Sequence, residues 1–328
     1  MTYTPPFTIS AKAINLIAEI AAQIERYAIR MEQGDALLLR KINRIKTIQG
    51  SLAIEGNTLT ESQITDIING KHIVAPIREI QEVRNAIRTY DVYSSFDPFS
   101  MKDLQKAHRL MMEALIDDAG HFRKGGVGVF AGNEVIHIAP PADRVPSLLN
   151  DLFEWLKHSE DHLLIKSSVF HYEFEFIHPF SDGNGRIGRL WQSLLLGKLH
   201  PIFEHLPVEN MVYANQQGYY DAINQSSENA DCVFFIDFML QEILHALKMR
   251  QGDSLIKDVG VNVGANVGVN EGKILALIHL NNRISAKMLA EQLVLSTRQV
   301  ERLITGLKKK GYLVRMGSAK GGYWIVNR

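Results

Sequence analysis

Apolar residues recur at helical spacing along most of this 328-residue chain. In the segment 10–27, Ser10 is a good N-cap, and Ile14, Ile17 and Ile24 fall on one face of the predicted helix. The same periodicity predicts further helices over 35–48, 61–69, 76–93, 100–116, 143–158 and 161–176. The chain is therefore predicted to be mainly α.

One segment breaks the helical pattern. Residues 123–141, RKGGVGVFAGNEVIHIAPP, alternate Val127 and Val129 with glycine, pass through the turn sequence AGNE and return to apolar residues. This alternation around a turn is typical of a β-hairpin, and Pro140-Pro141 would end it. We predict a short hairpin, or flap, in an otherwise helical domain.

The composition changes again at residues 259–270, VGVNVGANVGVN, a near-repeat of Val, Gly and Asn without helical period. Such glycine-rich sequence favours a flexible linker. We place a linker at 251–270, between a domain over 1–250 and a smaller domain over 271–328. In the smaller domain the pattern predicts three helices and a hairpin, with Ser285 and Ser296 as N-caps, which is typical of a winged helix-turn-helix.

The composition is that of an ordinary globular protein, with 46% hydrophobic and 22% charged residues. The N-terminus, MTYTPPFTIS, lacks the pattern of a secretory signal, and no apolar run approaches the roughly 20 residues that span a bilayer. The only cysteine, Cys232, lies in the apolar stretch CVFFIDFML, where we expect a buried hydrophobic role. Together these features predict a cytoplasmic protein without membrane contact.

The net charge of zero hides an asymmetry between the two predicted domains. Residues 271–328 hold eleven Lys and Arg against three acids, about +8, so the rest of the chain is about −8. Arg298, Arg302 and the run KKKG at 308–311 lie on or beside the predicted third helix. This basic surface leaves two interpretations open: contact with DNA phosphates, or a solvated face on a domain that binds protein or dimerises.

The candidate chemistry is concentrated in residues 178–189, HPFSDGNGRIGR. A buried helix is predicted to end at His178, because Pro179 disfavours the α conformation there, and a new helix restarts after the glycines. The loop thus meets a helix N-terminus, where unpaired N–H groups and the helix dipole favour anions. Arg186 and Arg189, one turn apart, add two permanent charges suited to a polyphosphate.

Two residues of the same stretch supply the remaining parts of a transfer reaction. Asp182 offers a hard oxygen ligand suited to Mg²⁺. His178 can titrate near neutrality and serve as a general base. The combination predicts transfer from a phosphate chain to a nucleophile that His178 deprotonates.

The stretch matches the motif of Fic domains in full, and the chain resembles that family over roughly residues 35–245. The resemblance implies an all-helical Fic core with a β-hairpin flap, joined here to the C-terminal winged helix-turn-helix. It implies transfer of AMP from ATP to a Tyr, Thr or Ser hydroxyl of a target protein, with self-modification expected. The implied roles are His178 as base, Asp182 on Mg²⁺, and Glu55, Gly183, Asn184, Gly185, Arg186, Ile187, Gly188, Arg189 and Tyr219 on the nucleotide. Within that set Tyr219 matches the adenine-side contact only by position, and an aromatic pair on a helix equally fits a core role.

Residues 51–57, SLAIEGN, carry a second and weaker pattern. Alone, Ser51, Glu55 and Gly56 read as the capped end of a helix. Beside the 178–189 stretch they match the family's inhibitory pattern, which implies that Glu55 pairs with Arg189 and blocks productive binding of ATP. In some members the same glutamate supports removal of AMP, and the sequence leaves both roles open.

Other polar residues favour structural roles. His137, His158, His162, His171, His200 and His205 have no partners at zinc-ligand spacing. Glu173 and Glu175, two apart, face different sides of their helix, so a carboxylate dyad is not expected.

The rival function is a transcription regulator whose Fic domain senses nucleotide while the C-terminal domain binds DNA. The target, the oligomeric state (a homodimer included) and the signal that frees Glu55 are left open.

Overall fold

The structure is a computed structural model, which describes residues 3–30, 33–131, 134–206, 208–252, 269–280, 282, 284–293, 295–316 and 322–326. Most of the predicted linker, residues 253–268, lies outside the described residues. Its first residues continue a helix that runs to Gly252, and its last residues begin the next helix at Val269. The division into domains stays a prediction.

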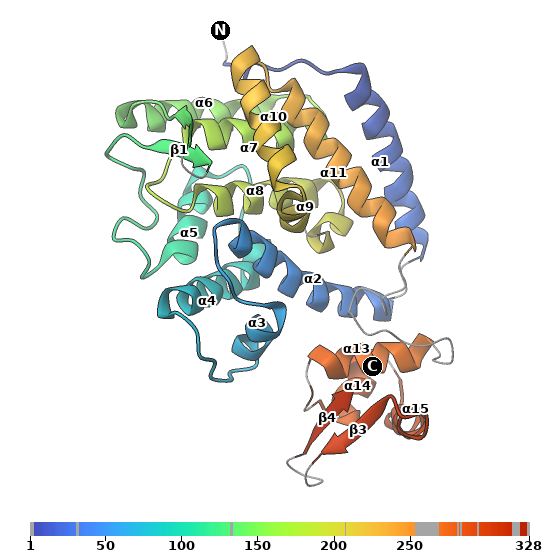
Figure 1. Cartoon of the computed structure of the whole chain (residues 1–328). Helices are drawn as coiled ribbons and strands as arrows, with labels where there is room; N and C mark the ends of the chain where they lie inside the picture. The colour runs from blue at the N-terminus through green and yellow to red at the C-terminus, as the bar shows by residue number, and fades with distance from the viewer. Residues whose placement is uncertain are drawn as a thin grey trace.

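The long first part of the chain is helical, as predicted (Figure 1). Its helices are α1 Ala11–Arg30, α2 Gln33–Ile54, α3 Glu61–Ile68, α4 Ile77–Asp91, α5 Met101–Met112, α6 Val145–His158, α7 Leu163–Ile177, α8 Asn184–Leu199, α9 Val208–Ala214, α10 Gln216–Asn229 and α11 Val233–Gly252, with 3₁₀ turns η1 Tyr93–Ser95, η2 Ala142–Arg144 and η3 Pro201–His205. The predicted helix at 35–48 is too short at its C-terminal end, because α2 continues through the second motif to Ile54.

Local capping explains where several helices begin. The Ser10 hydroxyl accepts the N–H of Ala13 at 2.9 Å, as expected for the start of α1. Thr60 and Gln63 form a reciprocal capping box at α3, which satisfies two backbone donors that the helix leaves unpaired. These caps fix the N-terminal ends of α1 and α3.

The core lies around α7 and α8, which pack against each other in the middle of the molecule (Figure 1). Large side chains from both helices are fully buried, among them Phe170, Phe174, Trp191 and Leu195. Helix α1 packs along α11, and α4 along α5. Because α7 and α8 are covered on nearly every side, the loop that joins them is held by a rigid frame.

The predicted hairpin is present between α5 and α6. Strands β1 Gly128–Ala131 and β2 Glu134–Ile138 pair antiparallel, with Gly128 opposite Ile138. The strands are shorter than the predicted segment 123–141, because residues 123–127 form the irregular base of the hairpin.

The C-terminal elements occur in the predicted order. They are α13 Val269–Leu280, α14 Ala286–Leu293, α15 Thr297–Lys309, β3 Leu313–Met316 and β4 Tyr323–Val326, and they enclose a hydrophobic cluster of their own. The Ser285 hydroxyl accepts the N–H of Met288, and Ser296 forms a capping box with Gln299, so both predicted caps are confirmed. The assignment of this unit as a winged helix stays a prediction.

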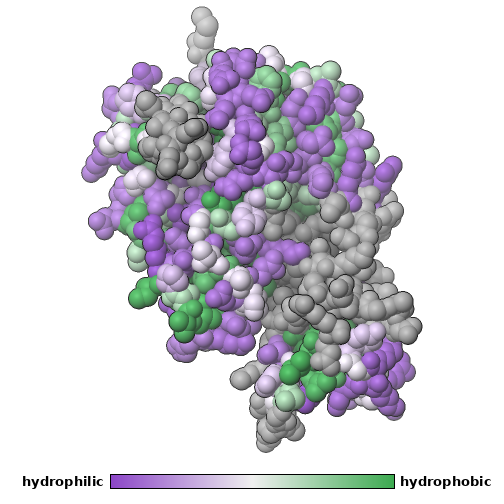
Figure 2. All heavy atoms as spheres, in the orientation of Figure 1, coloured by the Kyte–Doolittle hydropathy of each residue, from purple (hydrophilic) through white to green (hydrophobic). Residues whose placement is uncertain are grey.

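Hydrophilic residues cover most of the visible surface of the first part (Figure 2). Among the helices that the structure describes, none is both long and apolar enough to cross a membrane. Cys232 is fully buried, as expected for a hydrophobic role.

Candidate active site

The loop between α7 and α8 begins with a change of backbone conformation at His178. This residue caps α7 in the left-handed region, with φ 48° and ψ 63°, and its N–H donates to the Phe174 carbonyl. Few non-glycine residues adopt this region, which therefore often marks a functional position. The turn lifts His178 off the helix axis, and its side chain is 18% exposed.

Arg123, at the base of the hairpin, anchors the beginning of the loop. It is 3% exposed, and its guanidinium donates to the carbonyls of His178 at 2.7 Å, Gly125 at 2.8 Å, Pro140 at 2.5 Å and Ile177 at 3.3 Å. A planar guanidinium with five donors suits this task better than an ammonium. One side chain thus joins the loop between α7 and α8 to both ends of the hairpin.

Phe180 anchors the middle of the loop in the core. It is fully buried, and its ring stacks on His108 with centroids 3.6 Å apart. His108 accepts the Gly120 N–H at Nδ1 and donates from Nε2 to the Asp182 carbonyl at 2.9 Å. Burial lowers the pKa of His108 to about 4, which favours this neutral form. The Asn184 amide completes the clamp by accepting the Phe180 N–H and donating to the Phe180 carbonyl, both at 2.9 Å.

The start of α8 presents a bare backbone, as the glycines predict. Gly183 has φ 85°, and a Cβ there would lie 2.6 Å from the sulfur of Met112. A Cβ on Gly185 would lie 2.6 Å from Oε1 of Glu55 and 2.9 Å from Nη1 of Arg189. A side chain at Gly183 would clash with Met112 and strain the left-handed turn, and one at Gly185 would enter the space beside Glu55 and Arg189 in which an anion could approach the helix N-terminus.

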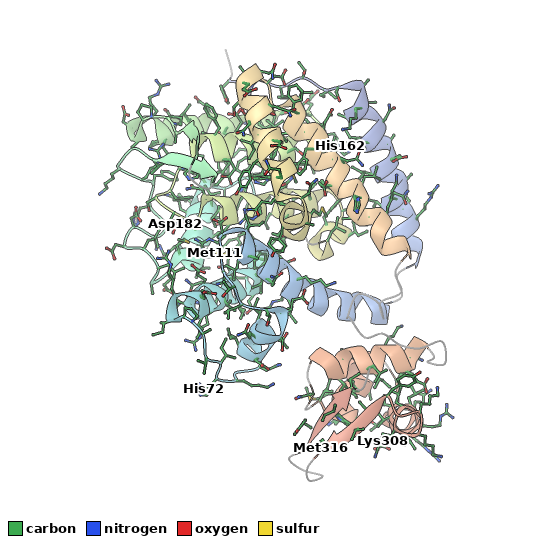
Figure 3. All side chains as sticks on the ribbon, in the orientation of Figure 1. His72, Met111, His162, Asp182, Lys308 and Met316 are labelled. Atoms are coloured by element: carbon green, nitrogen blue, oxygen red, sulfur yellow. The ribbon has the colours of Figure 1, made fainter. Side chains whose placement is uncertain are left out.

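Asp182 lies at the exposed side of the loop, near α5 and its Met111 in the view of Figure 3. Its Oδ1 accepts the Gly183 N–H at 2.6 Å and the Arg186 guanidinium at 3.2 Å. Its Oδ2 accepts from Arg78, at the start of α4, at 3.3 Å. The side chain is still 39% exposed, so its oxygens can reach solvent or a ligand.

Arg189 is held by the second motif. Its Nη2 donates to Glu55 Oε1 at 2.7 Å and to the Ser51 carbonyl at 3.0 Å, and the side chain is 2% exposed. Burial alone would lower the pKa of Arg189, but the Glu55 carboxylate outweighs it and raises this pKa. The ion pair predicted between Glu55 and Arg189 is therefore present.

A cavity of about 310 Å³ opens beside the loop. Glu55, His178, Gly185 and Arg189 share its lining with Tyr219 and other aromatic residues. Tyr219 is itself 4% exposed, and its hydroxyl contacts His171 Nε2 at 3.2 Å, so most of its ring belongs to the core. Its contact with adenine stays a prediction.

Five of the predicted nucleotide-binding residues lie outside this lining: Gly183, Asn184, Arg186, Ile187 and Gly188. Ile187 is fully buried in the core, and its N–H is bonded to the Gly183 carbonyl. Gly188 faces Glu175 and His171, since a Cβ there would lie 2.8 Å from Glu175 Oε1. Both residues shape α8 and its packing against α7.

Sequence reasoning missed three contributors: Arg123, Arg78 and His108. Each lies far from the motif along the chain and reaches it only through tertiary contacts. No local pattern distinguishes them, although Arg123 lies two residues before the glycines of the predicted hairpin.

Comparison with known proteins agrees with this geometry. A profile described as the Fic/DOC family matches residues 98–196, which include the whole loop. A crystal structure of a Fic family protein from Desulfovibrio desulfuricans G20 superposes with a TM-score of 0.73 at 39% identity, covering 99% of this chain and 98% of that one.

The matches to curated relatives extend over a smaller share of both proteins. The protein adenylyltransferase Fic of Nematostella vectensis is 27% identical over 202 residues, which are 58% of this chain and 45% of that protein. A probable protein adenylyltransferase of Aquifex aeolicus is 32% identical over 110 residues, 33% of this chain and 31% of that protein. The chain thus matches less than half the length of either relative. Because a Fic family structure at 39% identity matches this chain over nearly its whole length, the chain belongs to the Fic/DOC family.

Proposed function

We propose that the protein is an adenylyltransferase that moves AMP from ATP to a Tyr, Thr or Ser hydroxyl of a target protein. The observation that carries this proposal is the shared lining of one cavity by His178, the bare N-terminus of α8 and Arg189. A base, an anion site and a permanent charge are what attack on a phosphate chain requires. The names of the curated relatives support the same reaction class.

The chain's own residues would act as follows. His178 takes the proton of the acceptor hydroxyl, and the freed oxygen attacks the α-phosphorus. The bond from that phosphorus to the β-phosphate oxygen breaks, and pyrophosphate leaves. Because Asp182 Oδ1 accepts the Gly183 N–H, the N–H groups of Asn184 and Gly185 and the guanidinium of Arg186 stabilise charge on the phosphates. Arg189 orients the γ-phosphate once Glu55 has left it.

The residues present fit a magnesium ion at Asp182. Among the described residues no cluster of three His, Cys, Asp or Glu side chains gathers to bind a metal. One exposed carboxylate beside a phosphate site is nonetheless a usual arrangement for Mg²⁺, which takes its remaining ligands from phosphates and water. Bound there, the ion would neutralise charge on the phosphates, and Asp182 would hold it at the mouth of the anion site.

Glu55 would hold the enzyme in an inhibited state. Its carboxylate occupies Arg189 and lies against Gly185, so a negative group stands where a phosphate would bind. The same carboxylate is positioned to accept a proton from water, which would support removal of AMP from a modified target. If it does so, Glu55→Gly will gain transfer and lose removal.

The test is incubation of a lysate with the purified protein, Mg²⁺ and ATP labelled in the α-phosphate, followed by mass spectrometry of labelled peptides. We expect adenylyl groups on hydroxyl side chains, on the chain itself and on at least one other protein. The matched control is His178→Ala, which should bind ATP but label 10² to 10⁴ times more slowly, on the order of the loss of a general base. Undiminished labelling by that variant would contradict the role of His178.

A second candidate function is DNA binding by the C-terminal unit, with the Fic domain as a nucleotide sensor. The favouring observation is the outer face of α15, where Arg298, Arg302, Lys308 and Lys309 are exposed while Val300, Ile304 and Leu307 are buried. Figure 2 shows hydrophilic residues over this helix, and Lys308 is labelled in Figure 3. Several cations on one helix face fit phosphate contacts.

A further inference from the structure

We propose that Glu175 is a positioning residue for the base: its carboxylate holds the His178 imidazole through Nδ1 and leaves Nε2 to take the acceptor proton. The proposal rests on the proposed function for its kinetic consequences, but its structural core can be tested without any turnover.

The two side chains meet because of the turn at the end of α7. Glu175 lies three residues before His178, and the left-handed conformation of His178 keeps its ring close to the last helical turn. Glu175 Oε2 lies 3.8 Å from His178 Nδ1, which is within the range of an ion pair with a protonated imidazole and longer than a hydrogen bond. The two side chains are only 12% and 18% exposed. A carboxylate at this distance stabilises an imidazolium more strongly than it would in open water.

The second histidine near Glu175, His171, cannot replace His178 as the cation that pairs with this carboxylate. His171 Nδ1 contacts Gln192 Oε1 at 2.6 Å, and its Nε2 contacts the Tyr219 hydroxyl at 3.2 Å. Burial lowers the pKa of His171 to about 4, so this imidazole is neutral near pH 7. It lies 3.8 Å from Glu175 Oε1 and supplies no positive charge.

Space for the carboxylate is created in α8. Glu175 Oε1 is buried and has no hydrogen-bond partner among the described residues. A Cβ on Gly188 would lie 2.8 Å from that oxygen, so only glycine admits the side chain at this depth. A buried carboxyl oxygen without a partner is costly, and such costs are usually tolerated at functional sites.

The charges around Glu175 connect it to the inhibitory pair. Burial raises the pKa of Glu175 to about 7, Arg189 on α8 lowers this pKa, and Glu55 on α2 raises it. Tyr219 on α10 and the two histidines on α7 complete its surroundings. When Glu55 leaves, one negative neighbour is lost and the ionised form of Glu175 is favoured. Release of inhibition would therefore also prepare the base.

The chain offers a matched control in Glu173. This residue lies on the same helix, is 6% exposed, and has a pKa that burial likewise raises to about 7. Its Oε2 accepts the Tyr3 hydroxyl at 3.1 Å, on a different face from His178. Glu173→Gln thus changes a buried carboxyl on α7 without touching the base.

The first readout follows the His178 ring itself. In nitrogen-labelled protein, His178 is assigned by loss of its signal in His178→Asn, and its titration is recorded in wild type, Glu175→Gln and Glu173→Gln. Removing a carboxylate within 4 to 6 Å should lower the midpoint of the His178 titration by about one pH unit or more. We expect this shift in Glu175→Gln only. An unchanged midpoint in Glu175→Gln, or an equal shift in Glu173→Gln, overturns the proposal.

The second readout is the rate of self-labelling against ATP concentration in the Glu55→Gly background. Glu175→Gln should lower the maximal rate about 10- to 100-fold, less than loss of the base itself, with half-saturating ATP nearly unchanged. Glu175→Asp should restore part of the rate, and Glu173→Gln should keep all of it. A higher half-saturating ATP with an unchanged maximal rate would mean that Glu175 binds nucleotide, which contradicts the proposal. No labelling by any variant, together with the shifted titration, would instead reject adenylyl transfer and keep the contact.

Discussion

Replacing Glu55 with glycine should activate the protein. The substitution removes the carboxylate that accepts from Arg189 Nη2 at 2.7 Å and that lies against Gly185. Arg189 keeps its bond to the Ser51 carbonyl, so the guanidinium stays near the cavity while one of its donors becomes free for a phosphate. The residue lies just past the end of α2 at Ile54, where glycine costs little helix stability.

The size of the effect follows from the contact that is lost. A hydrogen bond to a charged group contributes about 1.5–3 kcal/mol, and Glu55 is 32% exposed, so the lower half of that range applies. Since about 1.4 kcal/mol corresponds to a tenfold change in an equilibrium, the share of chains able to bind ATP productively should rise about 10- to 50-fold. The rate of labelling at saturating Mg²⁺ and ATP should rise by the same factor.

The assay compares initial rates of self-labelling for wild type, Glu55→Gly, Glu55→Asp and the double variant Glu55→Gly with Arg189→Met. Aspartate, one methylene shorter, should relieve inhibition only in part. The double variant should lose the gain, because the freed site then lacks the charge that orients the γ-phosphate. The reasoning is refuted if Glu55→Gly labels no faster than wild type, or if the double variant stays as active as Glu55→Gly alone.

Three further predictions concern the frame, the core and the C-terminal unit. Arg123→Ala removes charged hydrogen bonds to several carbonyls and should lower the free energy of unfolding by about 3 kcal/mol or more, seen in chemical denaturation; a change below about 1 kcal/mol would contradict its anchoring role. Burial raises the pKa of Glu173 from its ordinary value near 4.5 to about 7. Protonation of this carboxyl therefore contributes folding stability that is fully present below pH 4.5 and is lost as the pH rises through 7. The stability of Glu173→Gln relative to wild type should therefore increase by up to about 3 kcal/mol between pH 4.5 and pH 8, and a flat difference would show that the carboxyl is not desolvated. Deleting residues 271–328 should leave self-labelling intact and abolish any DNA binding. In the full chain, DNA affinity should fall steeply as the salt concentration rises, and failure to retard any duplex at low salt would reject DNA binding.

Much of this fold follows from local pattern. Apolar spacing predicts the long helices, and the alternation around AGNE predicts the β1–β2 hairpin, because both signals are set by neighbours along the chain. The caps at Ser10, Ser285 and Ser296 follow from side chains that bond their own helix. The end of α2 was predicted too early, because its last turn is held by tertiary contact between Ser51 and Arg189 and not by periodicity.

In the candidate active site, too, some features follow from local sequence and others depend on tertiary contacts. The backbone conformation of the loop and the burial of Phe180 follow from the motif itself. The contributions of Arg123, Arg78 and His108 could not be predicted, because each bonds the loop from more than fifty residues away. Glu175 shows an intermediate case. Its spacing from His178 suggests contact on a helix, but the close approach depends on Gly188 in another helix and on the left-handed turn.

The most direct test of adenylyl transfer is the fate of label placed in different phosphates of ATP. Glu55→Gly is incubated with Mg²⁺ and ATP labelled in the α-phosphate or in the γ-phosphate, and the intact chain is then separated from nucleotide. If His178 directs attack on the α-phosphorus, the α-label stays on the protein and the γ-label leaves with pyrophosphate. Retention of the γ-label, or of neither label, would contradict the account.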